Sequence, residues 1–119
     1  MKLRHGDVEV TILDGAYVER GVPTPEAERY YTALCSRLDE YRRFAAERLL
    51  ALYNDTWFHD EIGHLDLAAF AARLAKPAVV LYDQPGVAAV YFHDGDIFGG
   101  HAIEISIEGE TAVQAELVG

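Results

Sequence analysis

The 119 residues are half hydrophobic, which suits one domain with its own core, and we expect residues 1–119 to form a single folded unit. The formal net charge of −10 is concentrated late in the chain, because residues 1–57 contain eight Lys/Arg and ten Asp/Glu whereas residues 58–119 contain two and ten. This charge disfavours nucleic acid and anionic lipid as partners and favours a basic protein, although acidity also serves solubility alone.

Three features predict a reducing compartment and no membrane. Cys35 is the only cysteine, so no internal disulfide can form. The start of the chain, Met1–His5, leads into charged residues rather than an apolar signal core. No apolar run approaches the roughly 20 residues that a membrane-spanning helix needs. We therefore expect a cytoplasmic protein with no membrane partner.

The first predicted element is a strand over residues 7–12, where Val8, Val10 and Ile12 alternate with polar residues and share one face. Asp14–Gly15 has the composition of a turn, and residues 16–19 are expected to form a short second arm. This segment therefore predicts the beginning of a half-buried sheet.

A long helix is predicted from Thr24 to about Asn54. Thr24 can accept hydrogen bonds from the first helical amides, Pro25 is tolerated at the first helical position, and no Gly or Pro follows. Apolar residues recur every three or four positions in one stripe, which comprises Ala27, Tyr31, Leu34, Leu38, Tyr41, Ala45, Leu49 and Leu52. At 1.5 Å per residue this helix would be roughly 45 Å long, which a break or an overhanging end would accommodate. A second, shorter helix is predicted to begin at Asp66 and to end before Pro77.

The stretch from Val87 to Ile107 is predicted to form the centre of an antiparallel sheet. Asp94–Gly95 stands between two apolar runs, as in a hairpin with a two-residue turn. Gly99–Gly100 would then form a bulge in the second arm, beyond which His101 and the alternating isoleucines share one face. Residues 78–82 are a further apolar run, joined to the hairpin by a turn over residues 83–86.

The last hairpin is predicted to have a three-residue loop over residues 108–110. This loop would place Ile107 opposite Thr111 and Ile105 opposite Val113. The other face of the hairpin would then be acidic, with Glu104, Glu108 and Glu116 on it. Together these elements predict an α+β domain: a mostly antiparallel sheet of about five or six strands, with one long N-terminal helix and one shorter helix packed on one face.

Two histidine groups are candidates for chemistry, and the residues favour a structural interpretation of each. His59 and His64 are five residues apart, not the four that place two zinc ligands on one helix face, so we predict no metal site and no cofactor. His93 and His101, with Asp94 and Asp96 nearby, could serve acid–base chemistry at neutral pH. No nucleophile elbow, phosphate loop or paired CxxC accompanies them, so we predict no catalytic residues and interpret His101 as an imidazole at the edge of the core.

The stretch from Asp94 to Ile107, which contains Phe98-Gly99-Gly100-His101-Ala102-Ile103, resembles the C-terminal signature of small bacterial domains of unknown function. In these domains a Phe or Leu precedes Gly-His-x-Ile-x-Val, after an upstream Tyr-x-x-x-Trp such as Tyr53 to Trp57. The resemblance covers about the last 70 residues, as judged by motif order. It implies that Trp57, Phe98, Gly99, Gly100 and His101 are shared structural positions, and that the function is that of a toxin immunity protein, as suspected for several such domains.

The function predicted from these observations is that of a non-enzymatic, acidic binding protein, and specifically an immunity-type inhibitor of a basic toxin. Its predicted binding residues are Asp94, Asp96, Glu104, Glu108 and Glu116. Two alternatives remain open: a small metal-dependent or hydrolase-like enzyme centred on His93 and His101, and a homodimer with no further partner, formed by the first strand or the long helix.

Overall fold

The computed structural model describes residues 1–13 and 15–119, and it has an α+β architecture. A six-stranded sheet has the order β1-β2-β5-β6-β7-β8, and its strands are β1 (Lys2–His5), β2 (Val8–Ile12), β5 (Ala75–Leu81), β6 (Val87–His93), β7 (Ala102–Glu108) and β8 (Thr111–Val118). The helices are α1 (Pro25–Cys35), α2 (Leu38–Leu52) and α3 (Leu67–Arg73), and a single π-helical turn, η1 (Tyr53–Trp57), continues α2. A separate two-stranded ribbon pairs β3 (Val18–Glu19) with β4 (Val22–Pro23). None of the helices in the described residues is both long and apolar enough to cross a bilayer.

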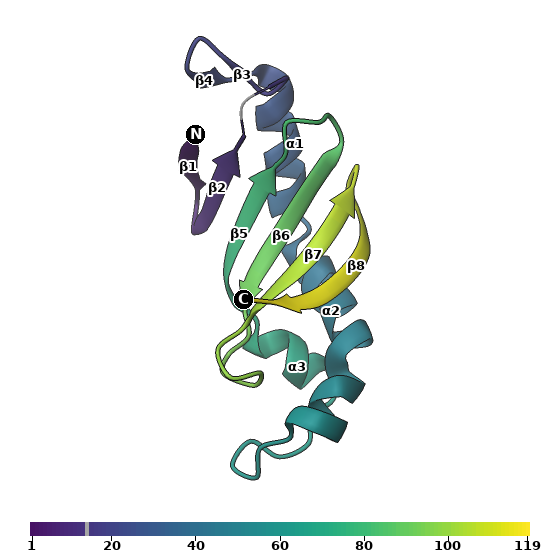
Figure 1. Cartoon of the computed structure of the whole chain (residues 1–119). Helices are drawn as coiled ribbons and strands as arrows, with labels where there is room; N and C mark the ends of the chain where they lie inside the picture. The colour runs from purple at the N-terminus through teal and green to yellow at the C-terminus, as the bar shows by residue number, and fades with distance from the viewer. Residues whose placement is uncertain (14) are drawn as a thin grey trace.

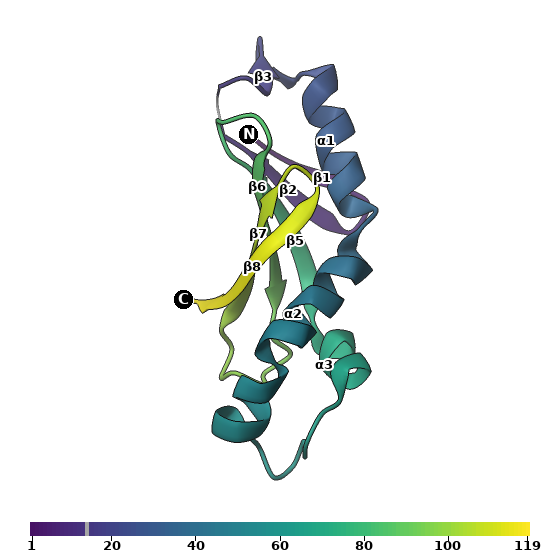
Figure 2. The same ribbon diagram turned by 90° about the vertical axis from the view of Figure 1, so that its right-hand side faces the viewer.

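The helices cover one face of the sheet, and none of the helices formed by residues 1–13 and 15–119 lies on the other face (Figures 1 and 2). The covered face is formed by side chains that alternate along the strands, as a half-buried sheet requires. Val10 and Ile12 of β2, Val79 and Leu81 of β5, Val90 and Phe92 of β6, and Ile103, Ile105 and Ile107 of β7 are all buried on it. From the helical side Leu34, Tyr41 and Ala45 complete this core. The predicted apolar stripe therefore faces the sheet, except for Leu52 at its end, which is exposed.

The sheet is mixed, and the prediction of a mostly antiparallel sheet with one long N-terminal helix was wrong. β2 pairs with β5 in parallel, with Val10 opposite Val79, while every other described pair in the sheet is antiparallel. The parallel pair arises because the whole helical segment lies between these two strands in sequence, and a helical crossover returns the chain to the same end of the sheet. A strand's own residues do not reveal the direction of its neighbour.

The predicted single helix is divided at Ser36–Arg37. The backbone of Arg37 is not helical, with φ −115° and ψ 18°, and the Ser36 hydroxyl donates to the carbonyl of Ala33 at 2.6 Å, a local bond that competes with helix continuation. The longest uninterrupted helical stretch is therefore α2 with η1, Leu38–Trp57. At the break the Arg37 guanidinium donates to Glu110 at 2.9 Å, and so the division brings the helices against the β7–β8 turn.

Both predicted helix starts are confirmed. The Thr24 hydroxyl accepts the amide of Ala27 at 3.1 Å, and the Asp66 carboxylate accepts the amide of Ala69 at 2.8 Å. The strand predicted over residues 7–12 corresponds to β2, and it has an additional edge partner, β1. The turn predicted at Asp14–Gly15 falls partly on residue 14, which lies outside the described residues.

The two C-terminal hairpins differ from prediction in their connections. β6 and β7 are antiparallel partners, but an eight-residue loop over residues 94–101 joins them instead of a two-residue turn. β6 is one of the two central strands of the sheet, as predicted, whereas β7 lies between β6 and the edge strand β8. β8 pairs with Glu108 opposite Thr111 and Ile107 opposite Ala112, with a bulge between this pair and Ser106 opposite Gln114. The predicted register of Ile107 with Thr111 was therefore wrong, because the turn is shorter and the bulge at Val113 restores the alternation further along.

Candidate functional site

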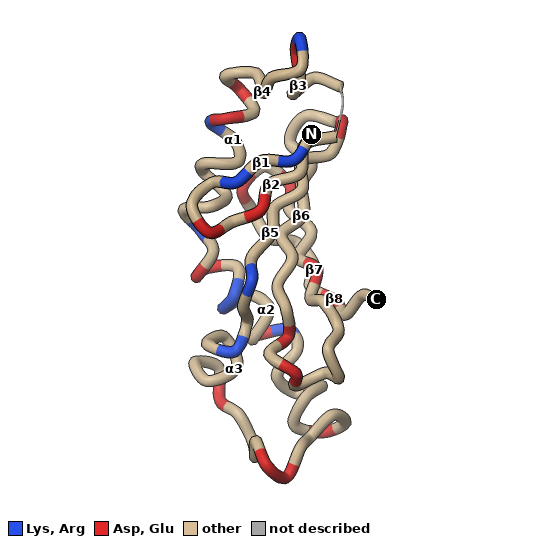
Figure 3. Tube along the Cα trace, turned by 90° about the vertical axis from the view of Figure 1, so that its left-hand side faces the viewer, with Lys and Arg blue, Asp and Glu red and all other residues tan. Residues whose placement is uncertain are grey.

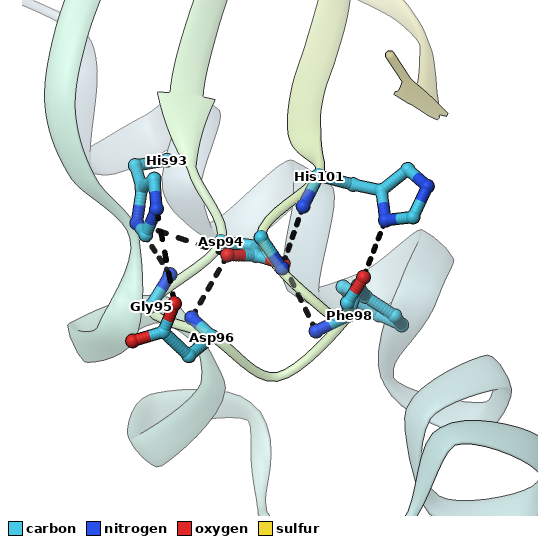
Figure 4. A network of polar contacts seen from close by, with 7 residues as sticks. His93, Asp94, Gly95, Asp96, Phe98 and His101 are labelled. Atoms are coloured by element: carbon cyan, nitrogen blue, oxygen red, sulfur yellow. Dashed lines mark hydrogen bonds and ion pairs between the residues drawn. The ribbon is translucent and has the colours of Figure 1, made fainter.

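The loop over residues 94–101 is organised around a single buried carboxylate. Asp94 is 0% exposed and is the one buried charged residue among those that the structure describes. One of its oxygens accepts the amide of Asp96 at 2.8 Å, and the other accepts the amides of Phe98, Gly100 and His101, each at 3.0 Å (Figure 4). Four N–H donors around one carboxylate compensate for the loss of hydration on burial.

This arrangement requires several residues with left-handed backbone. Gly95, Asp96, Gly99 and Gly100 all have φ between 62° and 86°, and this lets a short loop turn several amides toward one point. At Gly95 space is limiting as well, since a Cβ there would lie 2.5 Å from the carbonyl oxygen of Arg73. The Gly pair predicted to form a strand bulge is thus part of a carboxylate-binding loop.

The two histidines that flank the loop do not converge. His93 Nδ1 accepts the amide of Gly95 at 3.1 Å, and its Nε2 lies 4.0 Å from a carboxylate oxygen of Asp96. His101 Nδ1 is hydrogen-bonded to the carbonyl of Phe98, so Nδ1 is the donor there. Figure 4 shows the two rings on opposite sides of Asp94. The structure therefore does not bring His93 and His101 together around one reacting atom.

One group of side chains in the described residues could hold a metal ion: His93, Asp94 and Asp96 offer atoms within 4.8 Å of one another. Both oxygens of Asp94 already accept backbone amides, as does Nδ1 of His93. Nε2 of His93, the second lone pair of the Asp94 oxygen that accepts a single amide, and the exposed carboxylate of Asp96 remain available. Three ligands are fewer than a closed zinc site or a calcium site uses.

The remaining signature residues form an aromatic cluster that fastens the loop to η1. The Trp57 ring makes edge-to-face contacts with Phe98, at 5.8 Å between centroids, and with His101, at 5.6 Å. Phe98 is fully buried, and it also packs edge-on against Tyr53 and Phe70. His101 thus lies against Trp57 rather than with the isoleucines of β7.

Tyr53 and Asn54, which belong to the same helical turn as Trp57, hold the 58–66 segment in place. Neither residue was predicted to have this role. The Tyr53 hydroxyl donates to the carbonyl of Gly63 at 2.9 Å, and Asn54 makes two hydrogen bonds to the backbone of Leu65, at 3.0 and 3.1 Å. The Tyr-x-x-x-Trp spacing was the available signal for Tyr53, whereas nothing in the pattern distinguished Asn54 from an ordinary helix terminus.

The helix-free face of the sheet carries the second set of predicted residues. One row of directly paired residues crosses this face through all six strands, namely Arg4, Glu9, Ala78, Tyr91, Glu104 and Glu116. Arg4 is its only basic residue, at the β1 edge, and two glutamates end it at the β7–β8 edge. Figure 3 shows the charged positions along the whole trace. Among the described residues, no Lys or Arg forms an ion pair with Glu104, Glu108 or Glu116. We call these three glutamates the acidic sheet face.

A chain of hydroxyl groups holds Glu104 in place. The Tyr91 hydroxyl donates to the Glu104 carboxylate, and the Tyr82 hydroxyl lies 3.4 Å from that of Tyr91. Burial, followed by the hydrogen bond to Glu104, raises the pKa of Tyr91 far above its usual value, so this hydroxyl remains a donor at neutral pH. Glu104 is therefore a positioned carboxylate on a rigid strand.

The five predicted binding residues do not form one patch. Asp94 is buried within its loop, Asp96 is exposed on that loop, and Glu108 is exposed at the opposite end of β7. Glu104 and Glu116 are direct cross-strand partners between these ends. The acidic surface that a partner could contact is thus on the β7–β8 hairpin, and Asp96 lies outside it, in the loop before β7.

Comparison with known proteins gives a match to a family model. Neither the curated proteins nor the solved structures contain a match to this chain. A family model described as an uncharacterized protein conserved in bacteria matches residues 18–117, which include both the carboxylate-binding loop and the acidic sheet face. The chain therefore belongs to this uncharacterized bacterial family, DUF2262.

Proposed function

We propose that this protein is a non-enzymatic binding protein whose acidic sheet face receives a basic protein partner, and that it acts in the cytoplasm as an immunity-type inhibitor of a basic toxin. The observation that carries the proposal is the cross-strand pair of Glu104 and Glu116. Like charges directly opposite one another on adjacent strands destabilise a sheet, and no cation among the described residues offsets this pair.

A bound basic partner would turn the repulsion between Glu104 and Glu116 into a net favourable electrostatic interaction. Lys or Arg side chains placed over the β7–β8 hairpin would neutralise the repulsion, and the Tyr91 hydroxyl already holds Glu104 in one orientation, which lowers the ordering cost of binding. The absence of helices from this side leaves the strands accessible to such a partner (Figure 2). The inhibitor role itself is suggested by the resemblance of the Phe98–Ile103 stretch to suspected immunity proteins.

The test is a double variant, Glu104→Gln with Glu116→Gln, measured alone and with the partner that the proposal requires, a basic toxin to be identified among the products of neighbouring genes. Alone, the variant should be more stable by about 0.2–1 kcal/mol, because the cross-strand repulsion is removed. With the toxin at low salt, association should slow by about tenfold, and this difference should shrink at high salt.

The matched control is Asp60→Asn with Glu61→Gln, which changes the net charge by the same amount in the exposed 58–64 segment. This control should leave association with the toxin close to that of the unmodified protein. Equal slowing by both double variants would show that only net charge matters, and an unchanged association rate for the Glu104/Glu116 variant would refute the proposed face.

A further inference from the structure

A pocket of about 320 Å³ lies between α1 and two hairpin turns. Its walls are formed by Glu26, Arg29 and Tyr30 of α1, by Tyr17 before β3, and by Glu110 in the β7–β8 turn. This volume is at the lower end of the range for small-molecule sites, and so it suits a ligand of a few heavy atoms. We call it the tyrosine pocket.

Two phenol groups in the tyrosine pocket have protons with no acceptor. The Tyr30 hydroxyl is buried and has no hydrogen-bond partner among the described residues. The Tyr17 hydroxyl accepts the amide of Gly86 at 2.9 Å, and its own proton has no acceptor among those residues either. The two rings lie 5.9 Å apart. A buried polar group without a partner is rare in folded proteins, and each such case calls for an explanation.

The charged side chains of the pocket have both signs. Arg29 and Glu26 form no ion pair in the described part of the chain, whereas Glu110 is paired with Arg37 at 2.9 Å. The hydroxyls and Arg29 are donors suited to a carboxylate, and Glu26 is an acceptor suited to an ammonium group. An anion alone would be repelled by Glu26, and a cation alone would leave both phenol protons unsatisfied.

We propose that the tyrosine pocket binds a small zwitterion of the α-amino acid class, with its carboxylate at the Tyr17 and Tyr30 hydroxyls and Arg29, and its ammonium group at Glu26. This site is independent of the proposed inhibitor function, because it includes none of the acidic sheet face residues. The ligand supplies the acceptor that the two phenols lack, and it neutralises the charges of Glu26 and Arg29, which both belong to the α1 wall of the pocket.

The experiment is thermal unfolding of the whole chain with glycine, L-alanine and L-glutamine as probes at millimolar concentrations. At least one probe should raise the melting temperature saturably, by about 6 °C at tenfold excess over its dissociation constant. Acetate and methylammonium, which carry the two halves of the ligand separately, should give much smaller shifts. No shift with any probe, or an equal shift with acetate alone, would overturn the proposal.

Tyr30→Phe separates binding from folding. Without ligand, this variant should melt at the same or a higher temperature, because it removes an unpaired buried hydroxyl, and the probes should no longer shift it. The matched control is Tyr53→Phe, whose hydroxyl bonds Gly63 at the far end of α2; it should melt lower and keep the full probe-induced shift. Probe-induced shifts that survive in Tyr30→Phe, or a ligand-free loss in that variant as large as in Tyr53→Phe, would overturn the assignment.

Discussion

Removing the buried carboxylate of Asp94 should destabilise the protein more than any other change to a single charged group. Asp94→Ala deletes the acceptor of four backbone amides at 2.8–3.0 Å, and one of these donors, the amide of Phe98, is bonded in a fully buried setting. A hydrogen bond to a charged group contributes about 1.5–3 kcal/mol, but the other three amides can recover part of this from water. We therefore expect a loss of about 3–5 kcal/mol in the free energy of unfolding.

Asp94→Asn should cost less, about 1–3 kcal/mol, because its carbonyl oxygen can replace the oxygen that accepts three amides. Its NH₂ group would then face the amide of Asp96, donor against donor. The free energy of unfolding should therefore be highest for the unmodified protein, lower for Asp94→Asn and lowest for Asp94→Ala. This order follows from the way the four hydrogen bonds are shared between the two oxygens.

The assay is urea unfolding, combined with amide hydrogen exchange at Phe98, Gly100 and His101, whose protection should fall selectively. Asp96→Asn is the matched control, because its side chain is 85% exposed and Asn tolerates the left-handed backbone at this position. A loss below about 1 kcal/mol for Asp94→Ala, or an equal loss for Asp96→Asn, would refute the view that this carboxylate organises the loop.

Three further outcomes are expected. Gly95→Ala should destabilise the protein clearly more than Gly109→Ala in urea unfolding, because both have φ 62° but only at Gly95 would a Cβ meet the Arg73 carbonyl, at 2.5 Å; equal losses would argue against this close approach. Ile105→Ala should lower the free energy of unfolding by about 2–5 kcal/mol, because burial is lost and a cavity forms. An unchanged melting temperature would show that Ile105 is not part of the core. Burial, then Tyr17 and Glu110, raise the pKa of Tyr30 to about 12, so ionisation of this phenol should leave the free energy of unfolding unchanged below pH 10 and lower it as the pH rises from 10 through 12; absorbance at 295 nm should show a phenol that titrates there and disappears in Tyr30→Phe.

The local patterns of the sequence determined most of the elements of this protein. Alternation at Val8, Val10 and Ile12 marked β2, and the caps Thr24 and Asp66 marked helix starts that the structure confirms. These features could be predicted because their causes lie within a few residues: a hydroxyl or carboxylate reaches amides three positions ahead, and side chains two positions apart share one face of a strand. The α+β class followed from the same signals.

Tertiary structure alone decided the parallel pairing of β2 with β5 and the role of the loop after β6. The sheet direction depends on β5, a partner distant in sequence. The helix break at Ser36–Arg37 combines the local hydrogen bond of Ser36 with the long-range bond between Arg37 and Glu110. Asp94 is the clearest case. Next to Gly95 it had the composition of a hairpin turn, but its carboxylate binds amides up to seven residues ahead, in a loop whose Phe98 is buried against Trp57 and Tyr53. A short-range pattern reports the conformations that a residue tolerates, and burial by distant partners selects among them.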